Sequence, residues 1–530
     1  MPPDDESIAP PPAAARTIDE YLQSAYDGSS SWRERWRYAL ILAAIGVSSV
    51  ADAAELFTMG YVLGEKQFQT AVLRGDLARG GAAVAGIANI GLLAGGIAAA
   101  AAEGRVGRKA TILIGLSVSA LGGVACAASV GVASFTSCRF IVGMGIGAIL
   151  SCNAAIATEQ SPPRERGFLV SAINSFWTVG IIGNSVWAYL LFHVFDLSWR
   201  IFMLVTTLPT IAGIFLILFL VPESPRFLAV QGSYESAAAS ANQIASAMGY
   251  KGSPLQAAEV SYHYNNHQPP ALFARETESR SQPLRIKQQV HQAIGNVKKL
   301  YRGDLRRPVI TVQLLWILVS VGTSLASWIN TIFQEIHLRN RYLNLIFLNC
   351  SSVLGSVASA LLTDRIGRNA FLTAFLALSG AALAATAALS SDAHAEERTP
   401  AIVASIAFYY VGLTGVWTVL YVVVAELFPT DVRATGVVLC STVGRLAAAG
   451  AMFANGALVK SPGALLGAGA AVLTAGAALS WACPPEEMRC RAVRDRSFTV
   501  KVWGEGDGVP LDCDSLPLLG SNGTSVDKVM

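Results

Sequence analysis

Long apolar stretches separated by short polar ones are the dominant pattern of this chain. An apolar helix of about 20 residues crosses the roughly 30 Å hydrocarbon core of a lipid bilayer. The pattern therefore predicts twelve transmembrane helices. They are expected near residues 38–63, 82–102, 110–130, 134–157, 168–192, 200–221, 308–333, 342–363, 370–390, 401–426, 434–458 and 462–482.

A polar segment divides the twelve apolar runs into six and six. This division predicts an all-α membrane protein with two six-helix halves, an organisation that is typical of secondary transporters. Within the polar segment, Ser233 to Met248 is Ala-rich and expected to be helical, whereas Tyr262 to Pro283 has the composition of a loop. The expected parts are an N-terminal tail 1–37, a first half 38–221, a central loop 222–307, a second half 308–482 and a C-terminal tail 483–530.

The first apolar run contains two acidic residues near its middle, Asp52 and Glu55. A spacing of three places both carboxyl groups on one face of a helix. A charged group at the centre of a membrane helix costs about 2.5–3.5 kcal/mol on insertion scales, so such residues mark a function by default. We expect the two acids to bind substrate or protons. The alternative is that one or both lie near a headgroup or pair with a neighbouring cation.

Composition supports a membrane protein and excludes several other classes. Hydrophobic residues are 53% of the chain, charged residues 14%, and the net charge is +3. No dense basic stretch indicates nucleic-acid binding. The glycines near Lys109 lack the spacing of a phosphate-binding loop, and His263 and His267 lack a third metal ligand. We expect no cofactor, no bound metal and no enzymatic activity.

Charge distribution predicts the orientation in the membrane. The N-terminal segment has no apolar region of a cleaved signal peptide. The short connections do not decide the orientation, but three longer basic segments fall on one predicted side: Arg33 to Arg37, Lys298 to Arg307 and Arg489 to Arg496. Because basic residues are enriched on the cytoplasmic side, both termini and the central loop are expected there.

Two charged patterns recur at matching positions in the two halves. Glu103 to Lys109 follows the second run and Asp364 to Arg368 the eighth, and E-x-x-P-x-x-x-R follows the fourth and tenth runs. Such charges can join the halves when the cytoplasmic side closes and separate when it opens, although they could also be simple cytoplasmic loop charges. The expected gate residues in these repeats are Arg108, Glu159, Arg166, Asp364, Arg368, Glu426 and Arg433.

These repeats resemble motifs of the major facilitator superfamily, in particular those of its sugar and organic-ion transporters. Two further stretches share this resemblance: Arg139 to Gly145, which opens the fourth run, and Pro222 to Arg226, which follows the sixth. The sequences VADAAELF, SFWTVG, SWRIFMLV and TDRIGR resemble the synaptic vesicle glycoprotein 2 and related-protein group. The resemblance implies the twelve-helix fold of that superfamily. It also adds Arg139, Glu223 and Arg226 to the expected cytoplasmic gate.

The sequence departs from this resemblance at two places. Gly104 stands where the first-half motif has Asp, with Glu103 one position earlier, so the contact of that acid is open. About eight residues separate the seventh and eighth runs, so the large luminal domain of the synaptic vesicle glycoproteins is missing there.

Further site candidates come from helices that line the central path in the fold resembled. Trp177, Asn184, Trp417 and Tyr421 lie on polar or aromatic stripes and are expected to contact substrate, although aromatic stripes also serve packing and headgroup belts. Arg445 lies about twelve residues into the eleventh run, where a permanent cation needs a partner. We expect Asp52 or Glu55 to pair with Arg445 in at least one state.

Together these features predict a secondary transporter that moves a small polar organic solute, an organic ion or a sugar, by alternating access with proton coupling. A passive uniporter and a non-transporting membrane scaffold are the alternatives. The expected setting is the plasma membrane or an intracellular vesicle membrane, with the lipid bilayer, protons and the solute as partners and the chain as a monomer. Asp514 to Leu519 fits an acidic dileucine sorting pattern.

Overall fold

The computed structural model describes residues 16–29, 35–267, 295, 297–302, 306–338, 340–390, 397–428 and 432–481. In this part of the chain, twelve helical segments are long and apolar enough to cross a membrane, and each corresponds to one predicted run within a few residues. The predicted tail 483–530, with the dileucine pattern, lies outside the described residues.

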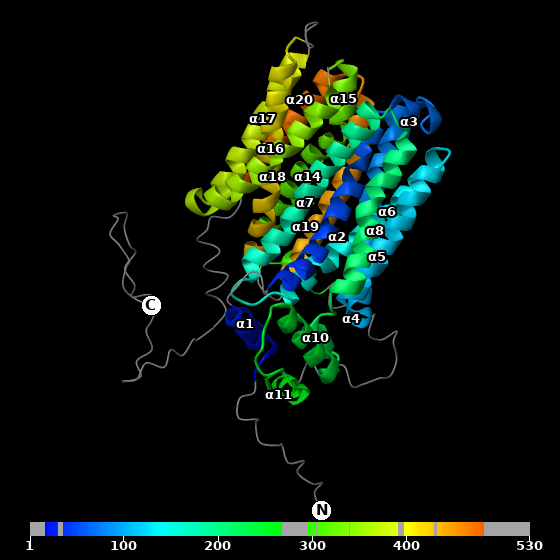
Figure 1. Ribbon diagram of the computed structural model, residues 1–530. Coiled ribbons are helices and arrows are strands. Elements are labelled where there is room, and N and C mark those ends of the chain that lie inside the picture. The colour runs from blue at the N-terminus through cyan, green and yellow to red at the C-terminus, as the bar shows by residue number, and fades with distance from the viewer. Residues whose placement is uncertain are drawn as a thin grey trace, which may run out of the picture. The chain divides into compact units, whose positions relative to one another are not determined.

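Six spanning segments form the first half and six the second (Figure 1). Those of the first half are α2 (Trp36–Val62), η1 with α4 (Leu77–Gly81, Ala82–Val106), α5 (Arg108–Ala128), α6 (Val132–Glu159), α7 with η2 (Arg166–Ala188, Tyr189–Val194) and α8 (Trp199–Leu220). Those of the second half are α14 with η4 and α15 (Arg306–Ser324, Leu325–Trp328, Ile329–Glu335), α16 (Arg341–Ile366), α17 (Arg368–Ser390), α18 (Thr399–Leu427), α19 (Arg433–Leu458) and α20 (Pro462–Ser480).

Close packing inside the first half depends on glycines of α6. A Cβ atom added at Gly143 would lie 3.0 Å from the carbonyl carbon of Ala88 in α4, and one at Gly145 would lie 2.7 Å from the Cβ of Ser119 in α5. Small residues let helix backbones approach, which favours association in a lipid environment where the hydrophobic effect does not drive it. The glycines therefore let α6 pack tightly against α4 and α5 at once.

Short helices mark the two ends of the bundle. At one end lie α1 (Ile18–Gly28), α10 (Tyr234–Ala247) and α11 (Ala257–His267), and we call it the α10 end; α3 (Lys66–Ala71) and α15 lie at the other, which we call the α15 end (Figure 1). The expected helix in Ser233 to Met248 is confirmed as α10. The expected loop from Tyr262 is helical as far as His267 in α11, and residues 268–283 lie outside the described part.

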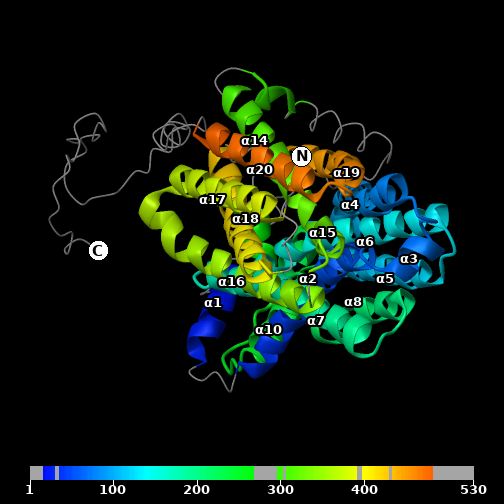
Figure 2. The same ribbon diagram turned by 90° about the horizontal axis from the view of Figure 1, so that it is seen from above.

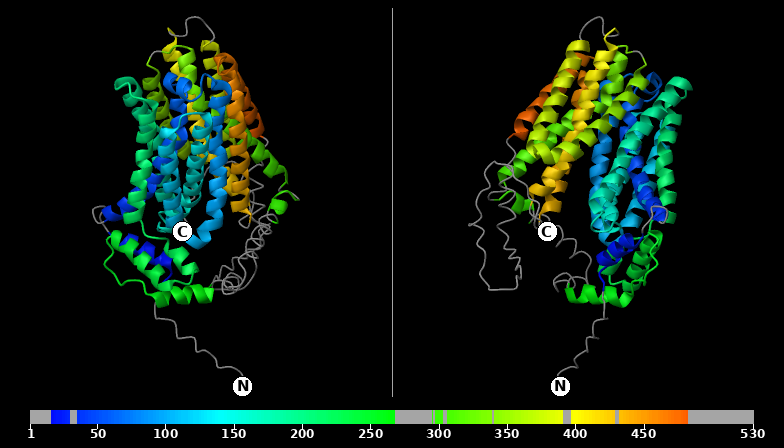
Figure 3. Two further views of the ribbon diagram at one scale, coloured as in Figure 1. Left: turned by 90° about the vertical axis from the view of Figure 1, so that its right-hand side faces the viewer. Right: turned by 60° about the vertical axis from the view of Figure 1, so that its left-hand side comes forward.

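The two halves meet along pairs of helices. In the first half α7 lies beside α16 of the second, and α4 lies beside α19 (Figure 2). At the α15 end, the amide nitrogen of Asn330 donates to the Tyr61 carbonyl at 2.9 Å, and that of Asn349 donates to the Tyr61 hydroxyl at 2.9 Å. Figure 3 shows the ribbons of the two halves close at this end and apart toward the α10 end.

Candidate functional site

A buried ion pair occupies the interior of the first half. A guanidinium nitrogen of Arg139, on α6, lies 3.6 Å from a carboxylate oxygen of Glu55, on α2, and neither side chain is exposed. The other terminal nitrogen of Arg139 donates to the backbone carbonyl of Glu55 at 2.9 Å. The hydroxyl of Thr207, on α8, donates to Glu55 Oε1 at 2.9 Å. Three helices therefore fix this carboxylate and its counter-charge.

The surroundings of Glu55 leave room for chemistry at one of its oxygens. Glu55 Oε2 has no hydrogen-bond donor in the described protein, and Nε and Nη1 of Arg139 have no acceptor. A Cβ atom at Gly123, on α5, would lie 2.8 Å from Glu55 Oε1, so the glycine makes space for the carboxylate. A proton on Glu55 would cancel its charge and release Arg139, so this pair can exist in two electrostatic states.

Asp52 lies one turn away from Glu55 and has a different environment. It is 1% exposed, and neither carboxylate oxygen has a hydrogen-bond partner among the described residues. Arg445, on α19 of the second half, is the cation that acts on it electrostatically. No ion pair within 4 Å is formed between them in the described part of the chain. The expected Asp52–Arg445 pairing therefore remains a prediction, while Glu55 has Arg139 as its partner.

Arg445 interacts with one member of an aromatic cluster, Tyr421. Its Nε donates to the Ser441 hydroxyl at 3.3 Å, and it interacts electrostatically with Tyr421. The Tyr421 ring, 46% exposed, lies 6.1 Å from the Trp417 ring and 5.0 Å from the Trp316 ring, centroid to centroid. The indole N–H of Trp417 donates to Thr323 at 2.8 Å. Trp417, Tyr421 and Arg445 thus belong to one cluster. Their contact with substrate remains a prediction.

Trp177 and Asn184 lie on α7, which packs against α2. Asn184 is buried and donates to the carbonyl of Ala54 at 2.9 Å, between the two acidic residues in the sequence. Trp177 makes an edge-to-face contact with Phe57, with centroids 6.4 Å apart. Asn184 therefore contacts the acidic turn of α2, whereas Trp177 contacts Phe57, two residues after Glu55. Their contact with substrate remains a prediction.

The expected gate residues of the first half lie together at the α10 end. Arg108 pairs with Glu159 at 3.3 Å and with Glu103 at 3.5 Å. Glu103 thus takes a partner although Gly104 stands at the usual Asp position. Glu223 accepts from the backbone N–H groups of Arg108 and Lys109, at 3.1 Å each, at the start of α5. A carboxylate at this place caps the positive end of the helix.

Arg166 and Arg226, also expected in the gate, converge on one acid from the N-terminal segment. Asp19 of α1 contacts Arg226 and lies 3.5 Å from Arg166. In α1 itself, the Thr17 hydroxyl accepts from the Glu20 N–H and the Glu20 carboxylate accepts from the Thr17 N–H, which closes a capping box. The segment expected to be a tail therefore supplies a partner for two of the expected gate residues, which the sequence did not indicate.

In the second half, Arg368 lies 3.4 Å from Glu426. Asp364 lies in α16 and Arg433 begins α19, but their side chains lie outside the described part of the structure. Between described residues, no ion pair at the α10 end joins the first half to the second.

The assignment of Arg139 to the cytoplasmic gate was wrong. Glu159, the gate residue at the other end of α6, lies at the α10 end, and Arg139 lies twenty residues before it in the same helix. Near the start of α6, Phe135 packs against Phe68 of α3 at the α15 end. Arg139 is therefore a partner of Glu55 in the interior.

A second ion pair missed by sequence reasoning joins the halves at the α15 end. Arg341, on α16, donates to Glu65 at 2.7 Å and to the Gly64 carbonyl at 3.2 Å, and the Tyr342 hydroxyl also contacts Glu65. We call these four residues the Glu65 latch. Of the ion pairs between two described residues, this one alone connects the halves. The isolated charges in short connections gave no signal for it.

The Glu65 latch borders a cavity of about 530 Å³. The pKa of Glu65 is raised to about 7. Burial is the main cause, Asp196 adds to the increase, and the positive charge of Arg341 opposes it. The other residues that line the cavity are Lys66, Gln67, Phe333, Gln334, His337 and Leu338.

Twelve spanning helices in two halves, with charged pairs in their interior and at both ends, define a membrane transporter of the major facilitator fold. The chain matches the family described as "Sugar (and other) transporter" over residues 56–480, and it belongs to that family. It is therefore an integral membrane protein, and its family consists of transporters.

Among curated proteins, the chain is similar to the niacin transporter NiaP of Acinetobacter baylyi, 25% identical over 68% of this chain and 75% of that one. It is also similar to human synaptic vesicle glycoprotein 2C, 27% identical over 38% of this chain and 29% of that relative's length. The resemblance to that group is thus confirmed.

Among solved structures, the fold is similar to the inward open conformation of the xylose transporter XylE from E. coli, with a TM-score of 0.64 at 15% identity, covering 84% of this chain and 96% of that one. A structure of the D-xylose-proton symporter gives a TM-score of 0.63 at 16% identity and covers 85% and 99% of the two chains.

Proposed function

We propose that this protein is a proton-coupled secondary transporter for a small organic solute, and that Glu55 is its proton-binding group with Arg139 as counter-charge. The observation that carries the proposal is the fully buried Glu55–Arg139 pair with an oxygen of Glu55 free of hydrogen-bond donors. A buried pair of this kind is an expensive way to hold helices together, because desolvation offsets most of the attraction. A role in binding and releasing protons explains its presence in the membrane interior.

Asp52 and Glu55 have separate roles in this proposal. Asp52 and Glu55 were expected to share one role, with Arg445 as their counter-charge. Two separate environments support a division instead: Glu55 is compensated within its own half, and Asp52 faces a cation from the other half. Glu55 then takes up the proton, and Asp52 remains available for substrate. The xylose–proton symporter of similar fold supports this coupling mode only as an analogy.

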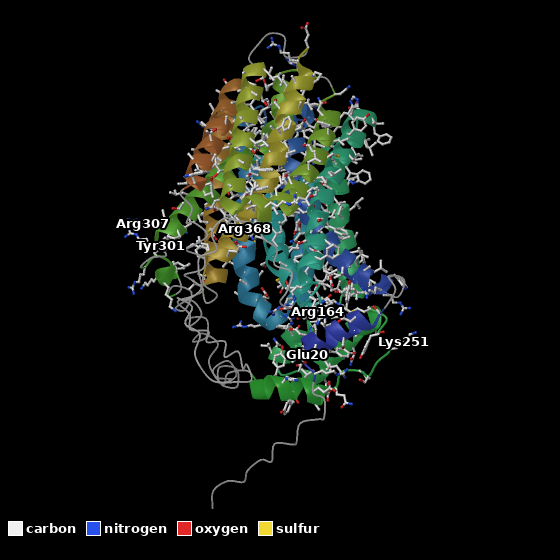
Figure 4. The ribbon with its side chains drawn as sticks, turned by 90° about the vertical axis from the view of Figure 1, so that its left-hand side faces the viewer. Glu20, Arg164, Lys251, Tyr301, Arg307 and Arg368 are labelled. Atoms are coloured by element: carbon white, nitrogen blue, oxygen red, sulfur yellow. The ribbon has the colours of Figure 1, made fainter. Side chains whose placement is uncertain are left out.

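Alternating access explains the two ends. The Glu65 latch joins the halves at the α15 end, whereas at the α10 end no ion pair between two described residues joins the first half to the second. We propose that the α10 end faces the cytoplasm. Arg164, Lys251, Arg307 and Arg368 lie toward this end in Figure 4, as the enrichment of basic residues on the cytoplasmic side requires. Accessibility of Lys251→Cys and Lys66→Cys to an impermeant thiol reagent in intact cells tests this orientation: only Lys66→Cys should react.

The coupling is tested by uptake into proteoliposomes with and without an inward proton gradient. Wild-type protein should accumulate solute above equilibrium only with the gradient. Glu55→Gln removes the titrating group, so accumulation should be lost while solute exchange at equal pH continues, which also shows that the variant folds. Glu235→Gln, an exposed change on α10, is the matched control. Gradient-driven accumulation by Glu55→Gln at the wild-type level would refute the assignment.

The same assay separates the alternatives. A passive uniporter would equilibrate solute with no accumulation under the gradient. A non-transporting scaffold would show neither exchange nor uptake.

A further inference from the structure

Besides the Glu55–Arg139 pair, the membrane interior holds two opposite charges that have no ion-pair partner within 4 Å among the described residues. Away from the helix ends, the described spanning segments carry Asp52, Glu55, Arg139 and Arg445 as charged residues. Glu55 and Arg139 neutralise each other. Asp52 and Arg445 act on each other electrostatically but form no ion pair within 4 Å in the described structure.

Neither Asp52 nor Arg445 has a full set of hydrogen-bond partners among the described residues of its own half. Neither oxygen of Asp52 has a hydrogen-bond donor among the described residues, although the residue is only 1% exposed. Among the described residues, Arg445 has one hydrogen-bond acceptor, the Ser441 hydroxyl, which leaves most of its five N–H groups for another partner. A buried charge without a partner is costly, so the binding of a molecule that supplies the missing partners is strongly favoured.

The chemistry of the pair defines the molecule that fits it. A neutral sugar can donate and accept hydrogen bonds but leaves both charges uncompensated. An anion satisfies Arg445 and leaves Asp52, and a cation does the reverse. A zwitterion satisfies both, with its carboxylate on the guanidinium and its cationic group on Asp52.

The residues beside Arg445 fit the body of such a molecule. Tyr421 is partly exposed and interacts with Arg445, and the Trp417 ring lies 6.1 Å from the Tyr421 ring, centroid to centroid. The faces of aromatic rings attract cationic and flat apolar groups. Because Asp52 belongs to the first half and Arg445 to the second, a bridging ligand would also draw the two halves together.

We propose that Asp52 and Arg445 are the substrate-binding pair of this protein, and that its substrate is a small zwitterion that bridges them. This inference rests on the proposed transport function and specifies its substrate class.

The test measures thermal unfolding of the purified full-length protein with charge-matched probes. Glycine betaine and N-methylnicotinate are permanent zwitterions, choline and N-methylnicotinamide are their cationic counterparts without the carboxylate, benzoate is an anion, and D-xylose is neutral. At equal concentration, at least one zwitterion should raise the unfolding temperature more than its cationic counterpart, benzoate and xylose do. Stabilisation by xylose with none by either zwitterion would overturn the inference.

Two variants show which residue binds the carboxylate of the zwitterion and which binds its cationic group. Arg445→Gln should weaken binding of the active zwitterion by about 10- to 100-fold, the effect of losing a hydrogen bond to a charged group, and should leave its cationic counterpart unaffected. Asp52→Asn should weaken the zwitterion similarly and should not weaken benzoate. Equal losses for all probes would contradict a bridging role. Arg445→Lys keeps the charge and should recover part of the binding if Arg445→Gln fails to fold.

Failure of this inference is distinguishable from failure of the proton proposal. Glu55→Gln should still be stabilised by the zwitterion while losing gradient-driven accumulation. If xylose accumulates with the proton gradient and zwitterions do not bind, the transport proposal stands and the substrate class is wrong. If a zwitterion binds but a proton gradient does not drive its uptake, the substrate class stands and the proton coupling is wrong.

Discussion

The α10 end and the α15 end both carry Arg–carboxylate pairs, but the pairs differ in what they connect. At the α10 end, Arg108 pairs with Glu159 inside the first half and Arg368 with Glu426 inside the second. At the α15 end, Arg341 pairs with Glu65 across the halves. The first kind of pair links helices within one half, whereas the second kind links the two halves to each other.

This difference shows that repeated sequence motifs and the closed gate are separate features. The motifs at the α10 end are the charges that the duplication reveals, and the ion pairs between their described side chains lie within one half. The Glu65 latch has no counterpart in the repeats and yet makes the cross-half contact. Under the proposed orientation, the Glu65 latch lies on the outer side of the membrane.

The largest expected effect comes from locking the α15 end. A Cβ atom at Gly60 would lie 3.6 Å from the Cα of Ser327 in the second half, so cysteines at these two positions are within reach of a disulfide. Oxidation of Gly60→Cys/Ser327→Cys should abolish transport, because the halves can no longer separate there, and reduction should restore it. Uptake before and after reduction measures this. The single-cysteine variants control for pairing with native thiols, and unimpaired uptake by the cross-linked protein would show that the α15 end need not open.

A smaller effect is expected from removing the charges of the latch. The side chains of Glu65 and Arg341 are 17% and 22% exposed, so a double-mutant cycle with Glu65→Gln and Arg341→Gln should give a coupling energy of about 1–3 kcal/mol. The Arg368–Glu426 pair, 25% and 35% exposed, should give about 0–1 kcal/mol. Chemical unfolding in detergent measures both cycles. Equal coupling at the two ends would remove the contrast between them.

The pH dependence of the α15 end gives a third prediction. Burial raises the pKa of Glu65 to about 7 in the closed state. When the α15 end opens, Glu65 returns to water and its pKa returns to the usual value near 4.5. The closed state therefore binds the proton more tightly than the open state. Closure should therefore become more favourable as pH falls through about 7, by up to about 3 kcal/mol once pH is below about 4.5. The charged and titratable groups facing Glu65 are Arg341, Tyr342, Asp196, Lys66 and His337.

Distances between spin labels on the two halves, measured from pH 8 to pH 5, test this dependence. In wild-type protein the population closed at the α15 end should grow on acidification. In Glu65→Gln the Glu65 contribution should be absent, and any remaining dependence belongs to the other groups. A wild-type profile identical to that of Glu65→Gln would contradict the prediction.

The smallest effect is expected at the α10 end from Asp19→Asn. Asp19 is 45% exposed, so loss of its pairs with Arg166 and Arg226 should cost about 0–1 kcal/mol. Hydrogen exchange should increase in α1, while the spin-label distances at the α15 end stay unchanged. A shift in those distances would mean that α1 controls the state of the transporter.

The fold was predictable from sequence because each spanning helix is recorded locally as an apolar run. The acidic pair was likewise visible, since Asp52 and Glu55 contrast with their neighbours. Their partners were not: Thr207 and Arg139 meet Glu55 only through the packing of α2, α6 and α8. Even so, chain direction could have shown that Arg139, near the start of the fourth span, lies toward the end opposite to Glu159.

The Glu65 latch and Asp19 show a second limit. Both act between segments that are far apart in sequence: Glu65 contacts Arg341, and Asp19 contacts Arg226. Each side chain looks like an ordinary charge in a connection or tail. Only the arrangement of the helices gives these charges a partner and hence a role.

The central claim, that Glu55 couples solute movement to protons, is tested most directly by solute-driven proton flow. Proteoliposomes that enclose a pH-sensitive dye receive, at equal pH on both sides, the solute that most stabilises the protein. Entry of the solute should acidify the lumen of vesicles with wild-type protein or Glu235→Gln and leave that of vesicles with Glu55→Gln unchanged. Solute entry without any pH change in wild-type vesicles, or an equal pH change with Glu55→Gln, would contradict the account.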